Sequence, residues 1–223
     1  MSLTPADVHA KIKEITAPGG IFEMEQVLVD GHEYRAYKHA PNTMIDVLQG
    51  ARAHGGLEFL VYEGRRFTYD SFFAAVDGLA ASLQLDLGVA KGDRVAIAMR
   101  NNPEWLIAFT ASLLIGAVVV PVNSWGKTEE LRYAVEDSGC SLLVCDEARL
   151  QLIDECLEEL DLTVLVAGPD AGRAIGGRVL DFDTTVQAGA GREYQMPEIG
   201  REDNCVILYT SGSTGFPKGV LHR

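Results

Sequence analysis

The stretch that decides the fold is residues 91–123, KGDRVAIAMRNNPEWLIAFTASLLIGAVVVPVN, in which two short apolar runs flank a longer apolar segment. Residues 94–99 and 117–121 are rich in valine, isoleucine and alanine and lie next to Gly, Pro, Asn or Asp, which is typical of buried strands. Between them, Asn102 is suited to cap a helix that carries proline at its first position and ends before Gly116. The stretch therefore predicts a strand, a helix and a second strand, the βαβ unit of a parallel sheet.

Within this stretch, residues 105–122 carry no charge over a length of 18, which is close to that of a membrane-spanning helix. Gly116 and Pro121 interrupt the segment, however, and the Asn-Pro-Glu sequence before it marks an ordinary helix start. A buried helix followed by a buried strand explains the segment better than a membrane anchor.

The same alternation of apolar runs and amphipathic segments continues along the chain. It predicts helices over 129–137 and 147–160 and strands over 141–145, 163–167, 178–180 and 204–209. Residues 168–202 are rich in Gly, Ala and polar residues, and we expect them to be mainly surface loop around one short strand. The fold class that follows is α/β, with a doubly wound, mainly parallel sheet and helices on both faces.

Two hairpins are expected before this alternation, because the dipeptides Asp30-Gly31 and Glu63-Gly64 each separate a pair of strand-like runs. The runs cover residues 22–29 and 33–38 in the first hairpin and residues 57–62 and 66–69 in the second. Asn42 is expected to cap a helix over residues 43–53, and Thr68 a helix that continues toward Gly88. The first hairpin would form an N-terminal extension that precedes the α/β fold.

The acidic composition of the chain narrows the classes of function. Its 223 residues are 47% hydrophobic and 23% charged, an ordinary balance for a globular protein. Nineteen Lys and Arg against 32 Asp and Glu give a net charge of −13, so we expect no nucleic-acid partner and no anionic membrane surface. The four cysteines have no CxxC spacing and the histidines are scattered, so no zinc signature is present. The N-terminus lacks the apolar run of a signal peptide, and we expect a cytoplasmic protein.

Residues 209–220, YTSGSTGFPKGV, follow the last predicted strand and carry the clearest chemistry. Glycines allow successive backbone N–H groups to point into one concavity that binds an anion, and hydroxyl groups add donors. Lys218 is able to place a charge on a phosphate oxygen, and ligands of α/β sheets bind beyond the carboxyl ends of strands. A Walker A loop is excluded, because Pro217 and Gly219 stand where that motif needs Gly and Ser or Thr. The alternative is that this stretch is a flexible linker with no binding role, but a linker requires no lysine.

This stretch resembles the phosphate-binding signature of the adenylate-forming enzymes, which include acyl- and aryl-CoA synthetases, peptide-synthetase adenylation domains and luciferases. Four other segments are similar to the family and occur in its order: residues 66–72 (RFTYDSF), 91–99 (KGDRVAIAM), 102–105 (NPEW) and 114–123 (LIGAVVVPVN). The opening hairpin, ending in AYKHAPNT, is most similar to bacterial medium- and long-chain acyl-CoA synthetases.

The resemblance implies an ATP-dependent acyl-CoA ligase that works in two steps. A carboxylate, here expected to be a fatty acid, attacks the α-phosphate of ATP bound with Mg²⁺ and gives an acyl-adenylate and pyrophosphate. The thiol of coenzyme A then displaces AMP. By the same resemblance, the phosphate-binding residues are Thr210, Ser211, Gly212, Ser213, Thr214, Gly215 and Lys218.

The resemblance also implies that family segments with no counterpart here supply a metal ligand, the adenine and ribose contacts, much of the acyl pocket and a catalytic lysine. We therefore expect no catalytic residue and no metal ligand in this chain, which would form the first part of the large N-terminal domain and be inactive alone. The expected parts are an extension over residues 1–56, an α/β subdomain over 57–202, and a strand with the phosphate-binding loop over 203–223. An apolar face left uncovered would favour self-association.

Two alternatives to a CoA ligase stay open. A CoA-independent adenylating enzyme would share the loop and would reveal itself by a carrier-protein domain. A truncated protein without enzymatic activity would bind a nucleotide or a partner. Trp105 and Trp125 are expected to be core or edge aromatics, and His222 receives no role although it is close to the loop in sequence.

Overall fold

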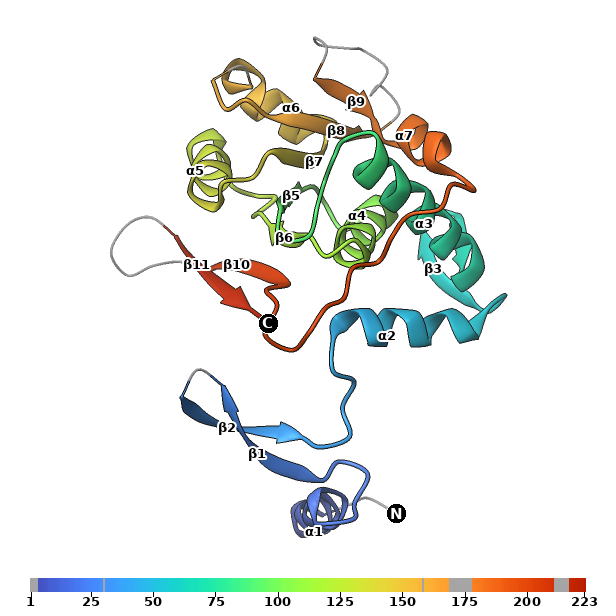
Figure 1. Cartoon of the computed structure of the whole chain (residues 1–223), viewed down its shortest axis with the longest axis vertical. Helices are drawn as coiled ribbons and strands as arrows, with labels where there is room; N and C mark the ends of the chain where they lie inside the picture. The colour runs from blue at the N-terminus through green and yellow to red at the C-terminus, as the bar shows by residue number, and fades with distance from the viewer. Residues whose placement is uncertain (1–3, 30, 158, 169–177, 211–216) are drawn as a thin grey trace. The chain divides into compact units, whose positions relative to one another are not determined.

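The computed structural model describes residues 4–29, 31–157, 159–168, 178–210 and 217–223, drawn in colour in Figure 1. The chain divides into two compact units, Met1–Asn42 and Thr43–Arg223. The three-part division of the sequence into 1–56, 57–202 and 203–223 stays a prediction.

The first unit contains helix α1 (Pro5–Thr16) and a hairpin of strands β1 (Met24–Val29) and β2 (His32–Tyr37). The strands pair antiparallel, which confirms the first predicted hairpin, although Asp30 of its turn lies outside the described residues.

Helix α1 was not expected from the sequence, yet its first residues carry a clear signal for the start of a helix. The Thr4 hydroxyl accepts the Asp7 N–H and the Asp7 carboxylate accepts the Thr4 N–H, which is a capping box.

The second unit is built on a seven-stranded sheet with the order β11-β10-β6-β5-β7-β8-β9. Neighbouring strands are parallel except for β10 and β11, which form an antiparallel hairpin at one edge. The strands are β5 (Arg94–Ala98), β6 (Val118–Pro121), β7 (Leu142–Asp146), β8 (Thr163–Ala167), β9 (Val179–Asp181), β10 (Val206–Thr210) and β11 (Lys218–His222). The mainly parallel α/β fold expected from the apolar runs is confirmed.

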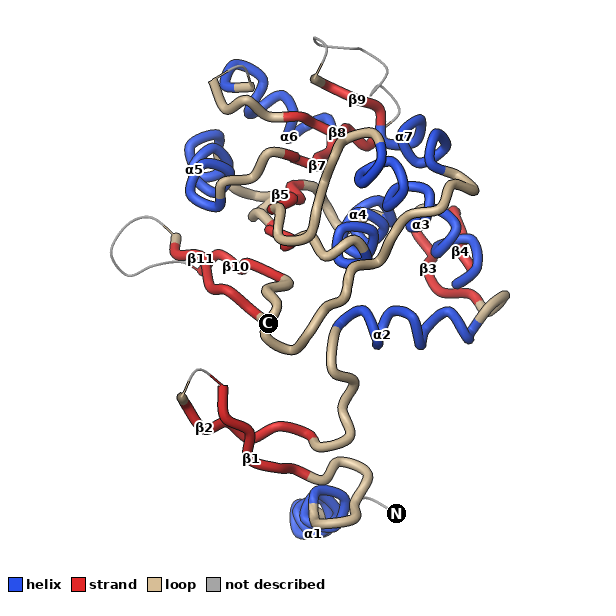
Figure 2. Tube along the Cα trace, viewed as in Figure 1, coloured by secondary structure: helices blue, strands red, loops and turns tan. Residues whose placement is uncertain are grey.

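Helices cover both faces of this sheet, and two hydrophobic cores result (Figures 1 and 2). Residues of one strand alternate between the cores, as Val95 and Ile97 do with Ala96 and Ala98. The first core contains α3 (Tyr69–Leu85) and α4 (Pro103–Leu114), and the second contains α5 (Thr128–Ser138) and α6 (Glu147–Ile153). Because the central strands are buried on both faces, their sequences are apolar throughout.

The segment before the sheet follows the expected order of helix, hairpin and helix. Helix α2 (Met44–Ala51) passes into a short 3₁₀ turn, and β3 (Glu58–Tyr62) pairs antiparallel with β4 (Arg65–Thr68). The turn residues Glu63 and Gly64 have φ of 47° and 84°, as a tight hairpin turn requires. Thr68 caps α3, and Asn102 caps α4 by accepting the Trp105 N–H, as the sequence predicts.

Three expectations for the helices were wrong. Thr43 caps α2 rather than Asn42, because Thr43 and Asp46 form a capping box. The helix expected over 147–160 ends at Ile153 and becomes a 3₁₀ turn, and like charges four residues apart, at Glu155 and Glu159, weaken a longer α-helix. The expected loop 168–202 contains a further helix, α7 (Phe182–Gly189), which packs on α3 and is capped by Asp181.

Along the described part of the chain, no helix combines the length and the apolar character needed to cross a membrane. The uncharged run at 105–122 is divided between α4 and β6, as its Gly and Pro residues predict.

Candidate functional site

The carboxyl ends of β5, β6, β7 and β10 lie at the same edge of the sheet, because these strands are parallel. Thr210 is the last residue of β10, so the Gly/Ser/Thr motif begins at this edge. The chain changes direction across the sheet between β5 and β7, because it runs from β5 to β6 on one side and then returns across β5 to β7. Strand β10 lies beyond β6, so the motif shares this carboxyl edge but begins with two strands between it and β7. Ligands of open α/β sheets bind at such a switch point, outside the carboxyl ends of the strands.

Two of the seven predicted phosphate-binding residues are described, and the structure brings them together. Thr210 and Lys218 are direct partners across the β10–β11 hairpin, and the Thr210 hydroxyl donates to the Lys218 carbonyl at 3.5 Å. Both residues are exposed, so neither supports the core. Ser211, Gly212, Ser213, Thr214 and Gly215 lie outside the described residues.

Tyr209, one residue before the motif, connects β10 to α5. Its hydroxyl donates to Asp137 Oδ2 at 2.7 Å and lies 3.3 Å from the Ala134 carbonyl oxygen. Burial raises the pKa of Tyr209, and the hydrogen bond to the Asp137 carboxylate raises it further. The phenol therefore stays a neutral donor across physiological pH.

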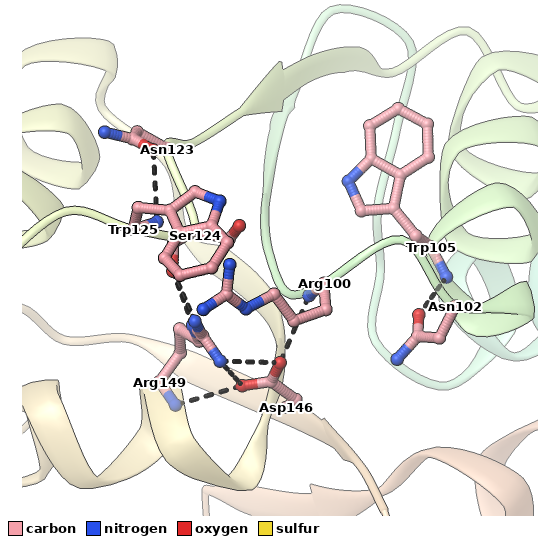
Figure 3. A network of polar contacts seen from close by, with 8 residues as sticks. All are labelled: Arg100, Asn102, Trp105, Asn123, Ser124, Trp125, Asp146 and Arg149. Carbon is pink, nitrogen blue, oxygen red and sulfur yellow. Dashed lines mark hydrogen bonds and ion pairs between the residues drawn. The ribbon is translucent and has the colours of Figure 1, made fainter.

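A polar network joins the ends of three neighbouring strands at the same edge (Figure 3). Asp146 ends β7, accepts the Arg100 N–H at 3.1 Å, and forms an ion pair with Arg149 at 3.1 Å. Arg149 Nε donates to the Ser124 carbonyl at 2.9 Å. Arg100 follows β5 and Ser124 follows β6, so the ion pair and its two hydrogen bonds link the segments that follow all three strands.

An exposed tryptophan lies above this network. The Trp125 side chain is 79% exposed, and the Arg100 guanidinium carbon lies 3.0 Å from the centroid of its ring (Figure 3). Trp105 differs, because it is half-buried and stacks on Phe109 with centroids 5.1 Å apart. Trp105 thus packs against the first core, as expected, whereas Trp125 lies exposed at the surface.

The Asp146–Arg149 pair gives a prediction about stability. The two side chains are only 16% and 12% exposed, so Asp146→Asn leaves a poorly solvated guanidinium beside a neutral amide. We expect the free energy of unfolding, measured by urea denaturation, to fall by about 1–2 kcal/mol. The matched control is Glu136→Gln, which alters an ion pair with Arg132 whose side chains are 46% and 39% exposed. The control should change stability by less than about 0.5 kcal/mol, and equal losses in both variants would contradict the prediction.

The sequence predicts neither the polar contacts of Asp146 nor the hydrogen bond from Tyr209 to Asp137, because the residues that these contacts join are far apart in the chain. The sequence does contain a local signal for Asp146. Asp146 directly follows a buried apolar run and precedes a helix, which marks an N-cap, and its side chain does accept the Arg149 N–H. Nothing in the sequence indicates that the same carboxylate also binds the backbone after β5.

The remaining candidates lie away from the carboxyl edge or have no reactive surroundings. His222 pairs with Val206 at the opposite end of the hairpin from Thr210. The four cysteines are free thiols, and burial raises the pKa of Cys140 to about 11. Over the residues that the structure describes, no group of three or more His, Cys, Asp or Glu side chains is arranged to hold a metal ion.

The fold is thus a mainly parallel α/β sheet, and the predicted phosphate-binding motif begins at the carboxyl edge of this sheet. The model of the AMP-binding enzyme family matches residues 48–223, and the chain belongs to this family.

Relatives in the family act on different carboxylates. The chain is 32% identical over 157 residues to the long-chain-fatty-acid–CoA ligase FadD13 of Mycobacterium tuberculosis, covering 70% of this chain and 29% of that protein. It is 35% identical over 155 residues to an L-proline–[L-prolyl-carrier protein] ligase of Streptomyces coelicolor, covering 69% and 29%. The chain thus spans about three tenths of the length of these relatives.

Solved structures agree with this assignment. An anthranilate CoA ligase, AuaEII, in complex with anthranoyl-AMP superposes with a TM-score of 0.72 at 25% identity, covering 80% of this chain and 34% of that one. A Mycobacterium tuberculosis fatty acyl CoA synthetase gives a TM-score of 0.65 at 28% identity, covering 78% and 33%. The fold is that of the N-terminal domain of adenylate-forming enzymes.

Proposed function

We propose that this chain provides the phosphate-binding part of an ATP-dependent acyl-CoA ligase. The observation that carries the proposal is the position of the motif: Thr210 and Lys218 face each other at the carboxyl edge of the sheet, inside the region matched by the AMP-binding family. The proposed reaction joins a carboxylate to AMP, releases pyrophosphate, and then transfers the acyl group to the thiol of CoA.

The first step requires positive charge and hydrogen-bond donors where pyrophosphate leaves. In this proposal, Lys218 places its ammonium group on the β- or γ-phosphate, and Thr210 adds a hydroxyl donor on the other strand of the hairpin. Ser211, Gly212, Ser213, Thr214 and Gly215 complete the set by their place in the motif. A bound Mg²⁺ would neutralise phosphate charge, and the described residues provide no ligand cluster for it.

We propose an aliphatic carboxylate as the substrate, because the opening hairpin is similar to fatty-acyl synthetases and FadD13 is one of the relatives. A panel of aliphatic acids, aryl acids and proline, given to the full-length protein with ATP and Mg²⁺, tests this. We expect pyrophosphate release and CoA thioester formation with aliphatic acids. Turnover of only an aryl acid or an amino acid would contradict the proposal.

A second candidate function is transfer to a carrier protein rather than to CoA. The observation that favours it is the 35% identity to the prolyl-carrier protein ligase. Both candidates form an adenylate, so they differ only in the thiol of the second step. Replacing CoA with a phosphopantetheinylated carrier protein in the same assay separates them, and we propose that CoA is the acceptor.

A further inference from the structure

Tyr209 links the phosphate-binding hairpin to the body of the second unit by contacts of two kinds. Its hydroxyl donates to Asp137 in the last turn of α5, at 2.7 Å, and lies 3.3 Å from the Ala134 carbonyl oxygen. Its ring meets the Tyr133 ring edge-on, with centroids 6.4 Å apart and an interplanar angle of 77°. The contacts of Tyr209 on α5 thus extend over more than one turn of the helix.

This link matters because the sheet holds β10 mainly at its beginning. Among the described strand residues, the parallel register between β6 and β10 comprises Val119 and Val206, and the Val119 N–H donates to the Cys205 carbonyl at 2.9 Å. Toward Thr210, the strand in register with β10 is β11, which itself lies at the sheet edge. The end of β10 that enters the motif therefore depends on side-chain contacts for its position.

The glycine of the Lys218-Gly219 pair lies against the Tyr209 and Ile207 side chains. Gly219 is the cross-strand partner of Tyr209, and a Cβ atom there would lie 3.4 Å from Tyr209 Cζ and 2.9 Å from Ile207 Cγ2. The backbone conformation of Gly219 is one that any residue adopts, so space rather than φ requires glycine. The ring lies against the residue that directly follows Lys218.

We infer that Tyr209 is a positioning residue that holds Thr210 and Lys218 in place against α5 through its hydrogen bond to Asp137. Tyr209 directly precedes Thr210 in the chain and packs on Gly219 beside Lys218, so it reaches both strands of the hairpin at the motif. The inference rests on the proposed function, because it assigns Tyr209 to the phosphate-binding step.

The test compares two variants that each remove one phenolic hydroxyl bound to an aspartate. Tyr209→Phe removes the bond to Asp137, and Tyr194→Phe removes a bond of 2.8 Å to Asp77, which joins the segment after α7 to α3. In the full-length protein we expect Tyr209→Phe to raise KM for ATP, or to slow adenylate formation, by about three- to tenfold. Thioester formation from a supplied acyl-adenylate should stay within about twofold, and Tyr194→Phe should leave both steps within about twofold.

Variants of the partner provide a rescue experiment. Asp137→Asn keeps a carbonyl oxygen that accepts the Tyr209 hydroxyl, whereas Asp137→Ala removes this acceptor and leaves only the longer contact of 3.3 Å to the Ala134 carbonyl oxygen. We expect Asp137→Ala to reproduce the Tyr209→Phe effect on adenylate formation and Asp137→Asn to restore most of the wild-type rate. Equal behaviour of the Asn and Ala variants would overturn the assignment of the hydrogen bond.

Hydrogen exchange distinguishes failure of the inference from failure of the proposed function. In the 223-residue chain, Tyr209→Phe should speed amide exchange at residues 208–210 and 218–220 by about three- to tenfold, and Tyr194→Phe should not. If the wild-type protein forms no adenylate but amide exchange responds as expected, the proposed function is wrong, and the positioning of the hairpin by Tyr209 is still supported. If adenylation is present and the two Phe variants behave alike, or if exchange is unchanged, the inference is overturned.

Discussion

Lys218→Ala in the full-length protein is expected to slow acyl-adenylate formation by about ten- to a hundredfold. In the role proposed for Lys218, the variant removes one charge-assisted contact to the phosphate that leaves as pyrophosphate, and such a contact contributes about 1.5–3 kcal/mol. Because only the first step expels pyrophosphate, transfer of the acyl group from a supplied adenylate to CoA should change much less. Single-turnover measurement of the two half-reactions separates these effects.

Two further variants make the Lys218 experiment specific. Lys218→Arg should restore little, because a planar guanidinium does not occupy the place of a compact ammonium group. Lys13→Ala, which removes an exposed lysine of α1, is the control and should change neither step. Since Lys218 is exposed, its substitution should alter the free energy of unfolding by less than about 0.5 kcal/mol. Equal slowing of both half-reactions, or of neither, would contradict the assigned role.

The parallel sheet was predictable from the sequence because its strands are buried on both faces. The runs at 94–99 and 163–167 are apolar throughout and correspond to β5 (Arg94–Ala98) and β8 (Thr163–Ala167). The place where the predicted phosphate-binding motif begins followed from the same reasoning, since Thr210 ends a parallel strand and therefore lies at the carboxyl edge. These features depend on local sequence and on general rules of α/β topology.

Helix α7 shows why other parts could not be predicted. Its residues Thr184, Thr185 and Val186 are β-branched and have low helix propensity, and a glycine follows them closely. The helix is stabilised instead by α3: the Ser82 hydroxyl donates to the Thr185 carbonyl at 2.7 Å. Tertiary contact outweighs local propensity here, and a single sequence gives no sign of a contact that spans 103 residues.

In the candidate site, too, one part could be predicted from the sequence and another could not. The residues of the motif could be named because they are consecutive, and their spacing indicates phosphate binding. The other polar contacts at this edge of the sheet could not be predicted, because Tyr209 and Asp137 are 72 residues apart and Arg100 and Asp146 are 46 apart. Ion pairs and hydrogen bonds between distant residues leave no periodic pattern, so only the folded structure reveals them.

The contact between α3 and α7 gives the prediction with the largest expected effect on stability. A Cβ atom at Gly189 would overlap the Gly78 carbonyl oxygen and would lie 2.8 Å from the Ser82 hydroxyl. A Cβ atom at Gly78 would lie 2.5 Å from the Val186 carbonyl oxygen. The two helices thus meet backbone to backbone, and no change of side-chain rotamer would make room for a methyl group.

Gly189→Ala is therefore expected to lower the free energy of unfolding by about 2–4 kcal/mol, because the helices must separate and Phe182 with its neighbours loses packing. Gly50→Ala is the matched control: Gly50 is an exposed residue of α2, and a Cβ atom there meets nothing within 4 Å. That variant should be neutral or raise stability by up to about 1 kcal/mol, since alanine favours the helix over glycine. Urea denaturation of the three proteins measures both values. Gly189→Ala within about 0.5 kcal/mol of wild type would show that α7 does not pack on α3 at this glycine.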